Sequence, residues 1–172
     1  MSDIIIEPFN SKQHDRQLFN CGIEVLNVYL KQKANQEQKK RLNLTYVAIK
    51  SSDTLPKPIL GYYTLSNSSV ALHTVQTELK KHIPPAYDIP SVKIGRLAVN
   101  KDQQSLGIGK QLLRHAFRKI IDVSAISGVR GIEVVAKNPK AKEFYEKFGF
   151  ISLKNTPNFL FMPIETVLNS QE

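Results

Sequence analysis

The segment Arg96-Leu97-Ala98-Val99, followed four residues later by Gln104-Ser105-Leu106-Gly107-Ile108-Gly109, is the most informative part of this 172-residue sequence. It predicts a strand, a glycine-bearing turn and the start of a helix. The first amides of a helix have no internal partners and lie at the positive end of its dipole. Such a turn can bind phosphate or pyrophosphate, and glycines let the backbone approach the ligand. The alternative is a plain turn at a helix start.

The turn does not match two common nucleotide motifs. The dinucleotide-binding fingerprint requires a third glycine, and the P-loop requires Gly-Lys followed by Ser or Thr. The helix after the turn is nevertheless well marked over residues 106–121. Its apolar residues recur on one face, and they are Leu112, Leu113, Ala116, Phe117, Ile120 and Ile121.

Strand and helix patterns continue on both sides of this segment. Strands are expected at 4–8, 45–50, 59–69, 91–99, 131–136, 150–153 and 158–163. Helices are expected as two short ones within 20–41, a short one at 74–82, the long one at 106–121 and one at 140–148. Strands alternate with helices in the second half, and antiparallel pairing dominates the first. The pattern predicts an α/β fold: one domain over residues 1–172, with a mixed, mostly antiparallel sheet flanked by helices on both faces.

The composition is that of an ordinary globular protein, with 41% hydrophobic and 23% charged residues. No apolar run reaches the roughly 20 residues that a membrane helix needs. The start of the chain carries Asp3 and no basic region before its short apolar run, so it does not resemble a signal peptide. The single cysteine, Cys21, excludes an internal disulfide and a cysteine-based zinc site. A soluble cytoplasmic protein is expected.

The net charge is the unusual feature of the composition. Twenty-four Lys and Arg residues against 15 Asp and Glu residues give +9. This excess suggests an anionic partner such as nucleic acid, a phosphorylated cofactor or an acidic protein, and the alternative is an inert basic surface. One cluster has a single acid, Glu37, among five cations: Lys31, Lys33, Lys39, Lys40 and Arg41. A second cluster contains Lys137, Lys140, Lys142, Lys147 and Lys154.

A second motif lies downstream, Asn138-Pro139-Lys140-Ala141-x-x-Phe144-Tyr145-x-x-Phe148-Gly149-Phe150. Together with Gln104-x-x-Gly107-x-Gly109 it resembles the two signatures of the GNAT superfamily of N-acetyltransferases. The flanking segments resemble the acetyltransferase toxins of type II toxin–antitoxin systems. These segments are Phe19-x-Cys21-Gly22-x-x-x-Leu26-Asn27-x-Tyr29-Leu30 and Pro157-Asn158-x-Leu160-Phe161-Met162-Pro163. Asn27 departs from that family, in which Asp is more common at this position.

The resemblance implies a role for each matching residue. The backbone of Leu97, Ala98 and Val99 should pair with the pantetheine arm of acetyl-CoA, as an open strand edge can. Asn138 should bind the cofactor arm and Phe144 should flank it, while Tyr145 should be the general acid for the leaving thiolate. The pyrophosphate should be held by the amides of Gln104, Ser105, Leu106, Gly107, Ile108, Gly109 and Lys110.

The chemistry of acetyl transfer agrees with these roles. A tyrosine with a pKa near ~10 suits protonation of a thiolate with a pKa of about 8.5. The sequence shows no dedicated general base. An α-amine titrates near ~8, so part of it is neutral at pH 7, whereas a lysine amine near ~10.4 would need a base. This comparison favours an α-amine as the acceptor.

Several of these residues have structural alternatives. Tyr145 could be a core tyrosine, and Asn138-Pro139 is a good helix start with or without a ligand. Cys21 is interpreted as a small buried hydrophobe. The four histidines show no metal spacing, so no metal is expected, and His115 is expected to be exposed. Arg96 could line the acceptor side, bind RNA phosphate or pair with a carboxylate.

The sequence therefore predicts an acetyl-CoA-dependent N-acetyltransferase, a toxin that acetylates the α-amino group of aminoacyl-tRNA and blocks translation. The first cluster and Arg96 would bind tRNA phosphate. One alternative is acetylation of a protein N-terminus or a small amine. Another is a catalytically silent operator-binding partner of an antitoxin. The resemblance further implies a homodimer, a ribbon-helix-helix antitoxin, and operator DNA bound only through the antitoxin complex, with no membrane association.

Overall fold

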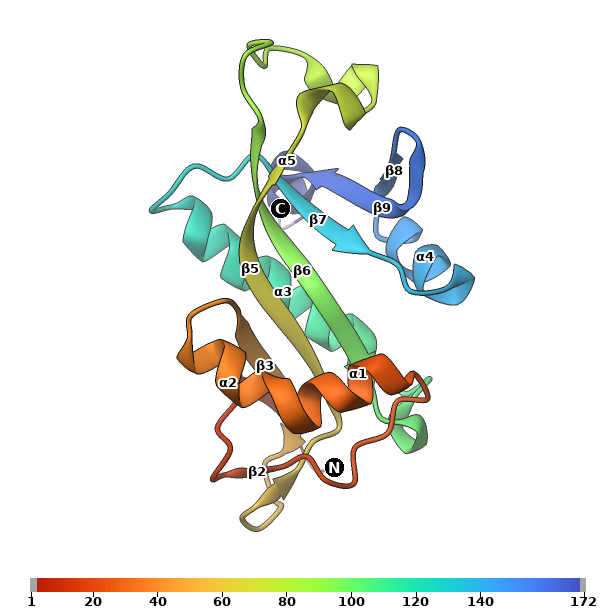
Figure 1. Cartoon of the computed structure of the whole chain (residues 1–172). Coiled ribbons are helices and arrows are strands. Elements are labelled where there is room, and N and C mark those ends of the chain that lie inside the picture. Colours follow the sequence, from red (N-terminus) through yellow and green to blue (C-terminus); the bar gives the residue numbers. More distant parts are fainter. Residues whose placement is uncertain (1–2, 171–172) are drawn as a thin grey trace. The chain divides into compact units, whose positions relative to one another are not determined.

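The computed structural model describes residues 3–170 and contains a seven-stranded sheet in the order β1-β3-β5-β6-β7-β9-β8 (Figure 1). The strands are β1 (Ile4–Pro8), β3 (Leu44–Lys50), β5 (Gly61–Val70), β6 (Ile89–Val99), β7 (Gly131–Val135), β8 (Ile151–Leu153) and β9 (Thr156–Pro163). Strand β1 is antiparallel to β3, as are β3 to β5 and β9 to both β7 and β8. Strands β6 and β7 are parallel. The predicted mixed, mostly antiparallel sheet is confirmed.

The helices follow the predicted order with some additions. They are α1 (Glu24–Val28), α2 (Ala34–Lys39), α3 (Ile108–Ser124), α4 (Pro139–Glu146) and α5 (Ile164–Asn169), with the π-helix η1 (Tyr29–Lys33) between α1 and α2. Short 3-10 turns are η2 (Leu72–Thr74), η3 (Thr77–Lys80) and η4 (Lys101–Gln103). None of the helices among residues 3–170 is long and apolar enough to cross a membrane.

The described chain divides into two compact units. Among the described residues, unit 1 comprises 3–66 and 96–116, and unit 2 comprises 67–95 and 117–170. Strands β5 and β6 each contribute residues to both units, and so does α3. The single domain expected from the sequence remains a prediction, and the two units are described one at a time.

Unit 1 has helices on both faces of its strands. On one face, Leu26, Tyr29 and Leu30 pack with Val47 of β3 and Tyr62 of β5 in one buried apolar cluster. On the other face, the first half of α3 meets the same strands, because the Tyr63 hydroxyl lies 2.7 Å from His115 Nδ1. The side chains of neighbouring strand residues point to opposite faces, so each strand serves both helical layers.

Unit 2 is built around aromatic and aliphatic side chains. Phe117 of α3 lies 6.4 Å from Phe148 and 6.2 Å from Phe150, measured between ring centroids, so α3 packs on the end of α4. A second cluster joins the segment after β5 to the sheet, and it comprises Val70, Val75, Ile89, Leu153 and Phe161. Arg130 pairs with Glu165 of α5.

The structure differs from the sequence predictions in five places. The two helices within 20–41 run on from one another through η1, where the Ala34 amide donates to the Tyr29 carbonyl five residues back and so keeps buried Ala34 on the inner face. The expected helix at 74–82 is replaced by two 3-10 turns that insert Val75 into the core. His115 is half-buried rather than exposed, because it meets Tyr63. Helix α5 and the small β2 (His14–Asp15)–β4 (Lys57–Pro58) pairing were not predicted.

Candidate active site

The glycine-bearing turn of unit 1 presents a run of unpartnered amides. Among residues 3–170, the amides of residues 105–110 donate neither to a backbone carbonyl nor to a side chain; the first bond of α3 runs from Gln111 to the Gly107 carbonyl at 3.1 Å. The Gln104 amide is already engaged, 3.3 Å from the Lys101 carbonyl. Ser105 and Gly107 both have positive φ, 65° and 85°. Consecutive free amides at a helix start form a site suited to pyrophosphate.

Gly107 has room on its outer side. A Cβ atom added there would meet no heavy atom within 4 Å. Packing within the protein therefore does not explain the glycine. Its left-handed backbone does, together with the close approach that a ligand would need. These observations fit a pyrophosphate at the amides of residues 105–110. The predicted set also included the Gln104 amide, which is already bonded, and the role of the others toward acetyl-CoA remains a prediction.

Strand β6 leads through η4 into this turn. It pairs with β7 from Ser91 opposite Gly131 to Ile94 opposite Val134. Leu97, Ala98 and Val99 lie beyond the last of these pairs, as expected of an edge that accepts a pantetheine arm. Ala98 is buried, with 6% of its surface exposed, while Leu97 and Val99 are half-buried.

The predicted general acid, Tyr145, lies in unit 2 on α4. Only 4% of its surface is exposed, and its ring makes edge contacts with Phe144 at 5.3 Å and Phe150 at 5.6 Å between centroids. Burial raises the pKa of the Tyr145 hydroxyl, so the phenol stays protonated at neutral pH. None of the residues 3–170 forms a hydrogen bond with that hydroxyl. A protonated, unpartnered phenol suits a proton donor.

The other two predicted cofactor residues of unit 2 flank Tyr145 in sequence. Asn138 caps α4, and its Oδ1 accepts the Ala141 amide at 2.8 Å. This is the helix-start role that needs no ligand, and it leaves the side-chain NH₂ for another acceptor. Phe144 is half-buried, 5.3 Å from Phe148 between ring centroids. The roles of both residues toward acetyl-CoA remain predictions.

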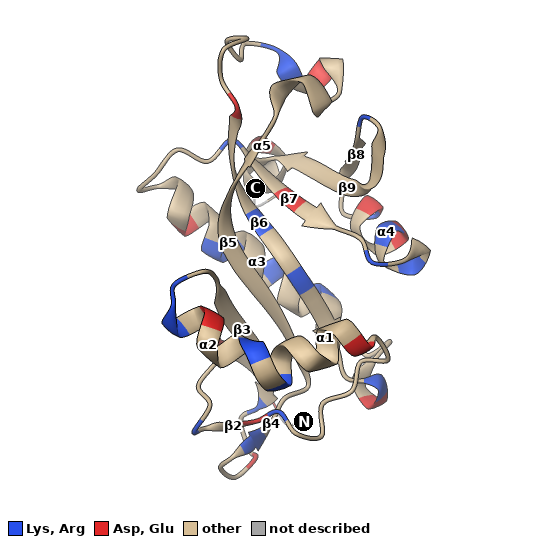
Figure 2. Cartoon of the chain, in the orientation of Figure 1, with Lys and Arg blue, Asp and Glu red and all other residues tan. Residues whose placement is uncertain are grey.

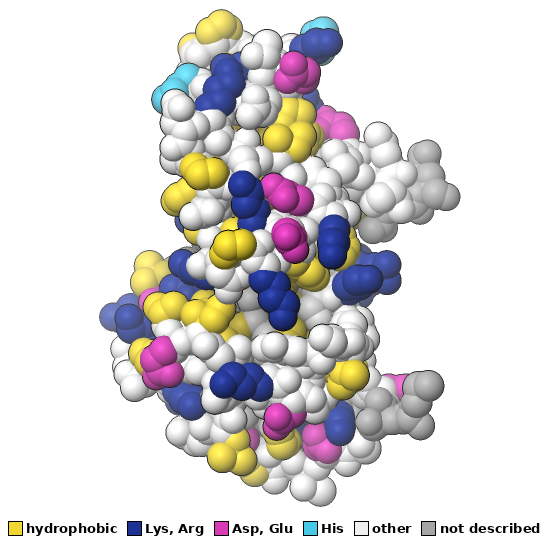
Figure 3. Space-filling model, turned by 90° about the vertical axis from the view of Figure 1, so that its right-hand side faces the viewer, with side chains coloured by type: hydrophobic (Ala, Val, Ile, Leu, Met, Phe, Trp, Pro, Cys, Tyr) yellow, Lys and Arg dark blue, Asp and Glu magenta, His cyan; other side chains and the backbone are white. Residues whose placement is uncertain are grey.

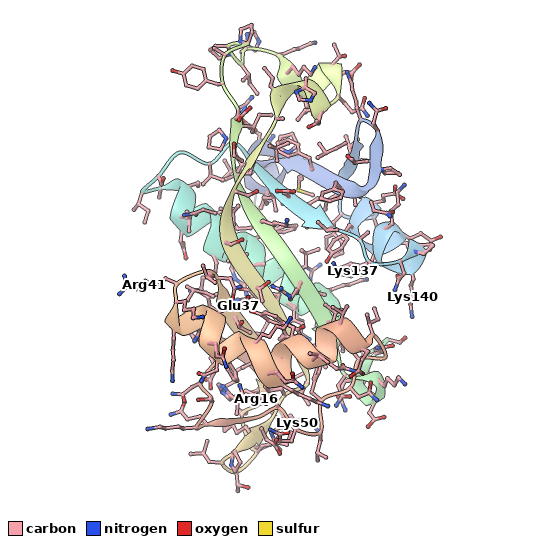
Figure 4. The ribbon with its side chains drawn as sticks, viewed as in Figure 1. Arg16, Glu37, Arg41, Lys50, Lys137 and Lys140 are labelled. Atoms are coloured by element: carbon pink, nitrogen blue, oxygen red, sulfur yellow. The ribbon has the colours of Figure 1, made fainter. Side chains whose placement is uncertain are left out.

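The first cation cluster lies along η1, α2 and the turn after it (Figure 2). Lys33, Lys39, Lys40 and Arg41 are exposed, and Lys31 is half-buried. No carboxylate among residues 3–170 pairs with these five cations, and Glu37 instead accepts the Asn43 side-chain amide at 2.7 Å. Figure 4 shows Arg41 pointing outward from unit 1. The second cluster is in unit 2, where Figure 4 labels Lys137 and Lys140 near the start of α4.

Arg96 does not pair with a carboxylate among residues 3–170, and its expected roles toward the acceptor and RNA phosphate remain predictions. Its guanidinium carbon lies 3.6 Å from the centroid of the Tyr29 ring, a cation–π contact. Tyr29 in turn donates to Asn43 Oδ1 at 2.8 Å, and burial raises the pKa of its hydroxyl. Arg96 thus keeps an unneutralised charge on the helix α1 side of unit 1.

Sequence reasoning missed Glu133, a carboxylate on β7 of unit 2. It is 7% exposed, accepts the Ser68 hydroxyl at 2.6 Å, and lies 4.0 Å from Lys93 Nζ. Lys93 and Glu133 face each other in the β6–β7 register, one pair before the last. A charged residue inside an apolar strand run was the available signal, because a buried carboxylate is rare unless it is paired or functional.

Other reactive side chains have structural environments. Cys21 is buried as predicted, and burial raises the pKa of its thiol, which makes it a poor nucleophile. Within residues 3–170, no group of three or more His, Cys, Asp or Glu side chains could hold a metal ion. Apolar side chains also reach the surface (Figure 3), and the most exposed include Leu18, Val25, Leu55, Leu106 and Ile126.

Comparison with known proteins identifies the family. The model of the acetyltransferase (GNAT) domain matches residues 68–152. A tyrosine-to-phenylalanine mutant of KacT has a structure that aligns with a TM-score of 0.90 and 34% identity, over 97% of this chain and 98% of that one. The chain belongs to the GNAT acetyltransferase family. The fold and the resemblance expected from the two motifs are therefore confirmed.

Further similar proteins are toxins. AtaT complexed with acetyl-methionyl-tRNAfMet aligns with a TM-score of 0.89 and 31% identity, over 99% of this acetyltransferase and 100% of that chain. AtaT has also been solved with acetyl-CoA and the C-terminus of the antitoxin AtaR. The probable toxin TacT of Sinorhizobium fredii is 25% identical over 170 residues, 95% of this chain and 92% of that protein.

Proposed function

We propose that this acetyltransferase is a toxin that transfers the acetyl group of acetyl-CoA to the α-amino group of aminoacyl-tRNA and so blocks translation. The observation that carries the proposal is the full-length similarity to AtaT, a toxin solved with its acetylated aminoacyl-tRNA. Two features of this chain support it independently. These are the free amides of residues 105–110 and the protonated phenol of Tyr145.

The proposed reaction assigns a task to each group. The amides of residues 105–110 hold the pyrophosphate, and the edge at Leu97–Val99 aligns the pantetheine arm. The neutral α-amine attacks the thioester carbonyl, the new C–N bond forms, and the C–S bond breaks. Tyr145 gives its proton to the departing thiolate, and the amine gives up a proton as the amide forms. Water can take that proton, which then restores the phenol. Before the attack, a carboxylate can take the extra proton of an acceptor amine that is still charged.

Glu133 is the carboxylate of unit 2 that best suits the role of proton acceptor. It is buried, and it faces Lys93 in the β6–β7 register. Lys93 and Ser68 hold it in place. An α-amine needs such help less than a lysine amine does, so the expected contribution of Glu133 is modest.

The unpaired cations favour RNA over the other acceptors. Five cations along η1, α2 and the turn after it, without carboxylate partners among residues 3–170, suit a polyanion. A polycationic small amine would instead need acidic residues. Tyr145 and the free amide turn argue against a catalytically silent operator-binding protein. A ribbon-helix-helix antitoxin, a homodimer and a cytoplasmic location complete the proposal, and operator DNA would be bound only through the antitoxin complex.

A transfer assay tests the function. The protein is incubated with acetyl-labelled acetyl-CoA and, separately, with aminoacyl-tRNA, uncharged tRNA, peptides with free N-termini and small amines. Label is expected on the amino group of aminoacyl-tRNA only, and it should stay on the amino acid after the ester bond to tRNA is hydrolysed. Preferential labelling of peptides or small amines would show that the acceptor is that compound and not aminoacyl-tRNA.

A further inference from the structure

The side chain of Gln104 bonds to two backbone carbonyls of unit 1. Its Nε2 donates to the Val99 carbonyl at 3.0 Å and to the Cys21 carbonyl at 3.0 Å. Both hydrogens of the amide are thereby used. The first residue of the cofactor turn is thus tied at once to the end of β6 and to a loop 83 residues earlier in the sequence.

That earlier loop, Asn20-Cys21-Gly22, meets the approach to the turn at two more points. The Lys101 amide donates to the Asn20 carbonyl at 2.8 Å, and the Asn20 amide lies 3.4 Å from Asn100 Oδ1. Gly22 has a φ of 92°, and a Cβ added to it would lie 2.9 Å from Lys101 Cε. The lysine stem therefore lies against the glycine, and a larger residue would displace it.

Helix α1 holds the other side of the same loop. Asn27, buried at 5% exposure, accepts the Cys21 amide at 2.9 Å and donates to Asn20 Oδ1 at 3.1 Å. An aspartate could accept the amide but could not donate to Asn20. Asn27 therefore makes one hydrogen bond, to Asn20, that the Asp more common in the family could not donate. A continuous set of hydrogen bonds leads from α1 through the loop to Gln104.

The amides of residues 105–110 need this support because nothing in the described chain binds them. Helix α3 fixes their downstream end, and the set of bonds around Gln104 fixes the upstream end. An anion site gains affinity when its donors are held in place before the ligand arrives, since no ordering cost is then left for binding.

We propose that Gln104 is a positioning residue, which fixes the pyrophosphate turn by bonding it to the Asn20–Gly22 loop, and that this loop is a structural part of the acetyl-CoA site. The inference rests on the proposed function only in taking acetyl-CoA as the donor. It requires no particular acceptor. It assigns the loop before α1 to the support of the cofactor site.

The first test measures the binding of two acetyl donors, acetyl-CoA and acetyl-pantetheine, to two matched variants. Gln104→Met keeps the side-chain length and removes both donated bonds, and Gln103→Met is the control next to it. Removal of one or two hydrogen bonds should weaken acetyl-CoA binding in Gln104→Met by roughly threefold to tenfold. Binding is measured by calorimetry for acetyl-CoA and by NMR titration for acetyl-pantetheine, which lacks the pyrophosphate. Acetyl-pantetheine should bind both variants as it binds the wild type.

The second test changes the Asn20–Gly22 loop itself and leaves Gln104 in place. Gly22→Ala should weaken acetyl-CoA binding by pushing against Lys101, although it touches no residue of the turn. Adding Lys101→Ala should recover part of the affinity, so the two changes should be non-additive in a double-mutant cycle. Unfolding curves confirm that each variant is folded.

Three results of these tests would decide against the proposal. Unchanged acetyl-CoA binding in folded Gln104→Met would overturn it, and so would an equal weakening for both donors, which would mark a general structural defect. Additive effects of Gly22→Ala and Lys101→Ala on acetyl-CoA binding would show that the loop is not part of the acetyl-CoA site. A wild-type protein that binds acetyl-CoA but does not acetylate aminoacyl-tRNA would overturn the proposed acceptor alone, and one that binds no acetyl-CoA would overturn both.

Discussion

Burial gives Tyr145 the protonation state that its proposed role needs. Phe144 and Phe150 pack against the ring, and its burial disfavours the phenolate and raises the pKa of the hydroxyl. Tyrosine hydroxyls in cores usually find a partner, and this one has none among residues 3–170. The free hydroxyl, and not the ring, is therefore the part of Tyr145 that packing does not explain.

Tyr145→Phe should slow acetylation by about 10² to 10⁴ while leaving acetyl-CoA binding nearly unchanged, because it removes the proton donor and keeps the packing. The wild-type rate should not fall through ionisation of this hydroxyl until the pH is well above ~10, since burial moves the pKa upward from that value. Single-turnover acetylation of aminoacyl-tRNA measures both. Tyr87→Phe, at a tyrosine that is 65% exposed, is the control. Full activity in Tyr145→Phe would assign protonation to water or another group.

Glu133→Gln should lower the acetylation rate most at low pH, because the carboxylate is needed only while the acceptor amine still carries its extra proton. With an amine pKa near ~8, a decrease of about tenfold at pH ~6.5 should shrink toward none above pH ~9. The measurement is the pH profile of kcat/KM, with Glu143→Gln on the exposed side of α4 as the control. A decrease that is the same at every pH would show that Glu133 only bridges β5, β6 and β7.

At the scale of elements, a helix or strand could be predicted where its apolar residues recur regularly or where particular residues mark its start or end. Helix α3 was predictable because its apolar face repeats over many residues, and α4 because Asn138 and Pro139 mark its start. Helix α5 was not predictable, since six residues with two buried ones, Ile164 and Val167, carry no clear period. The π-helix η1 could not be predicted either. Its wider turn is visible only in the structure, where the Ala34 amide donates to the Tyr29 carbonyl five residues back.

The candidate site was predictable from sequence to a similar degree. The amide turn and Tyr145 lie in short motifs with fixed spacing. The partners of Gln104 could not be predicted, because they are the carbonyls of Cys21 and Val99, and backbone groups leave no mark in a sequence. Glu133 was overlooked because its partners, Ser68 and Lys93, come from strands far apart in the chain.

Gly107→Val should abolish most acetyl-CoA binding, because its side chain would occupy the open space beside the free amides and its backbone would resist the positive φ. An obstructed site should bind less favourably by at least about 1.4 kcal/mol, a tenfold change in Kd. Gly128→Val is the matched control, since a Cβ there also meets nothing within 4 Å and the position lies outside the turn. Calorimetry gives Kd, and unfolding curves show whether backbone strain has instead destabilised the fold. Unchanged affinity in a folded variant would remove the turn from the site.

At the scale of the whole molecule, the charge of +9 is not evenly used. Some cations are paired within the protein, as Arg130 is with Glu165 and Lys142 with Glu146 at 3.9 Å. The cluster Lys31, Lys33, Lys39, Lys40 and Arg41 has no such pairs among the described residues. Unpaired surface cations contribute little to stability and remain free for phosphate. Changes in this cluster should therefore affect tRNA binding and not the stability of the fold.

Neutralising Lys33, Lys39 and Lys40 together should therefore weaken tRNA binding and leave unfolding unchanged. Each lysine that no longer neutralises a phosphate should reduce the slope of log K against log salt by about 0.7 to 0.9, so the triple variant should reduce it by about two or more. The control neutralises Lys12, Lys81 and Arg118, which are also exposed but lie outside the cluster. It matches the change in net charge, so a general field effect would alter both triple variants alike. Equal slopes in the cluster variant, the control and the wild type would show that these lysines face only solvent, and tRNA would then have to be bound elsewhere on the protein.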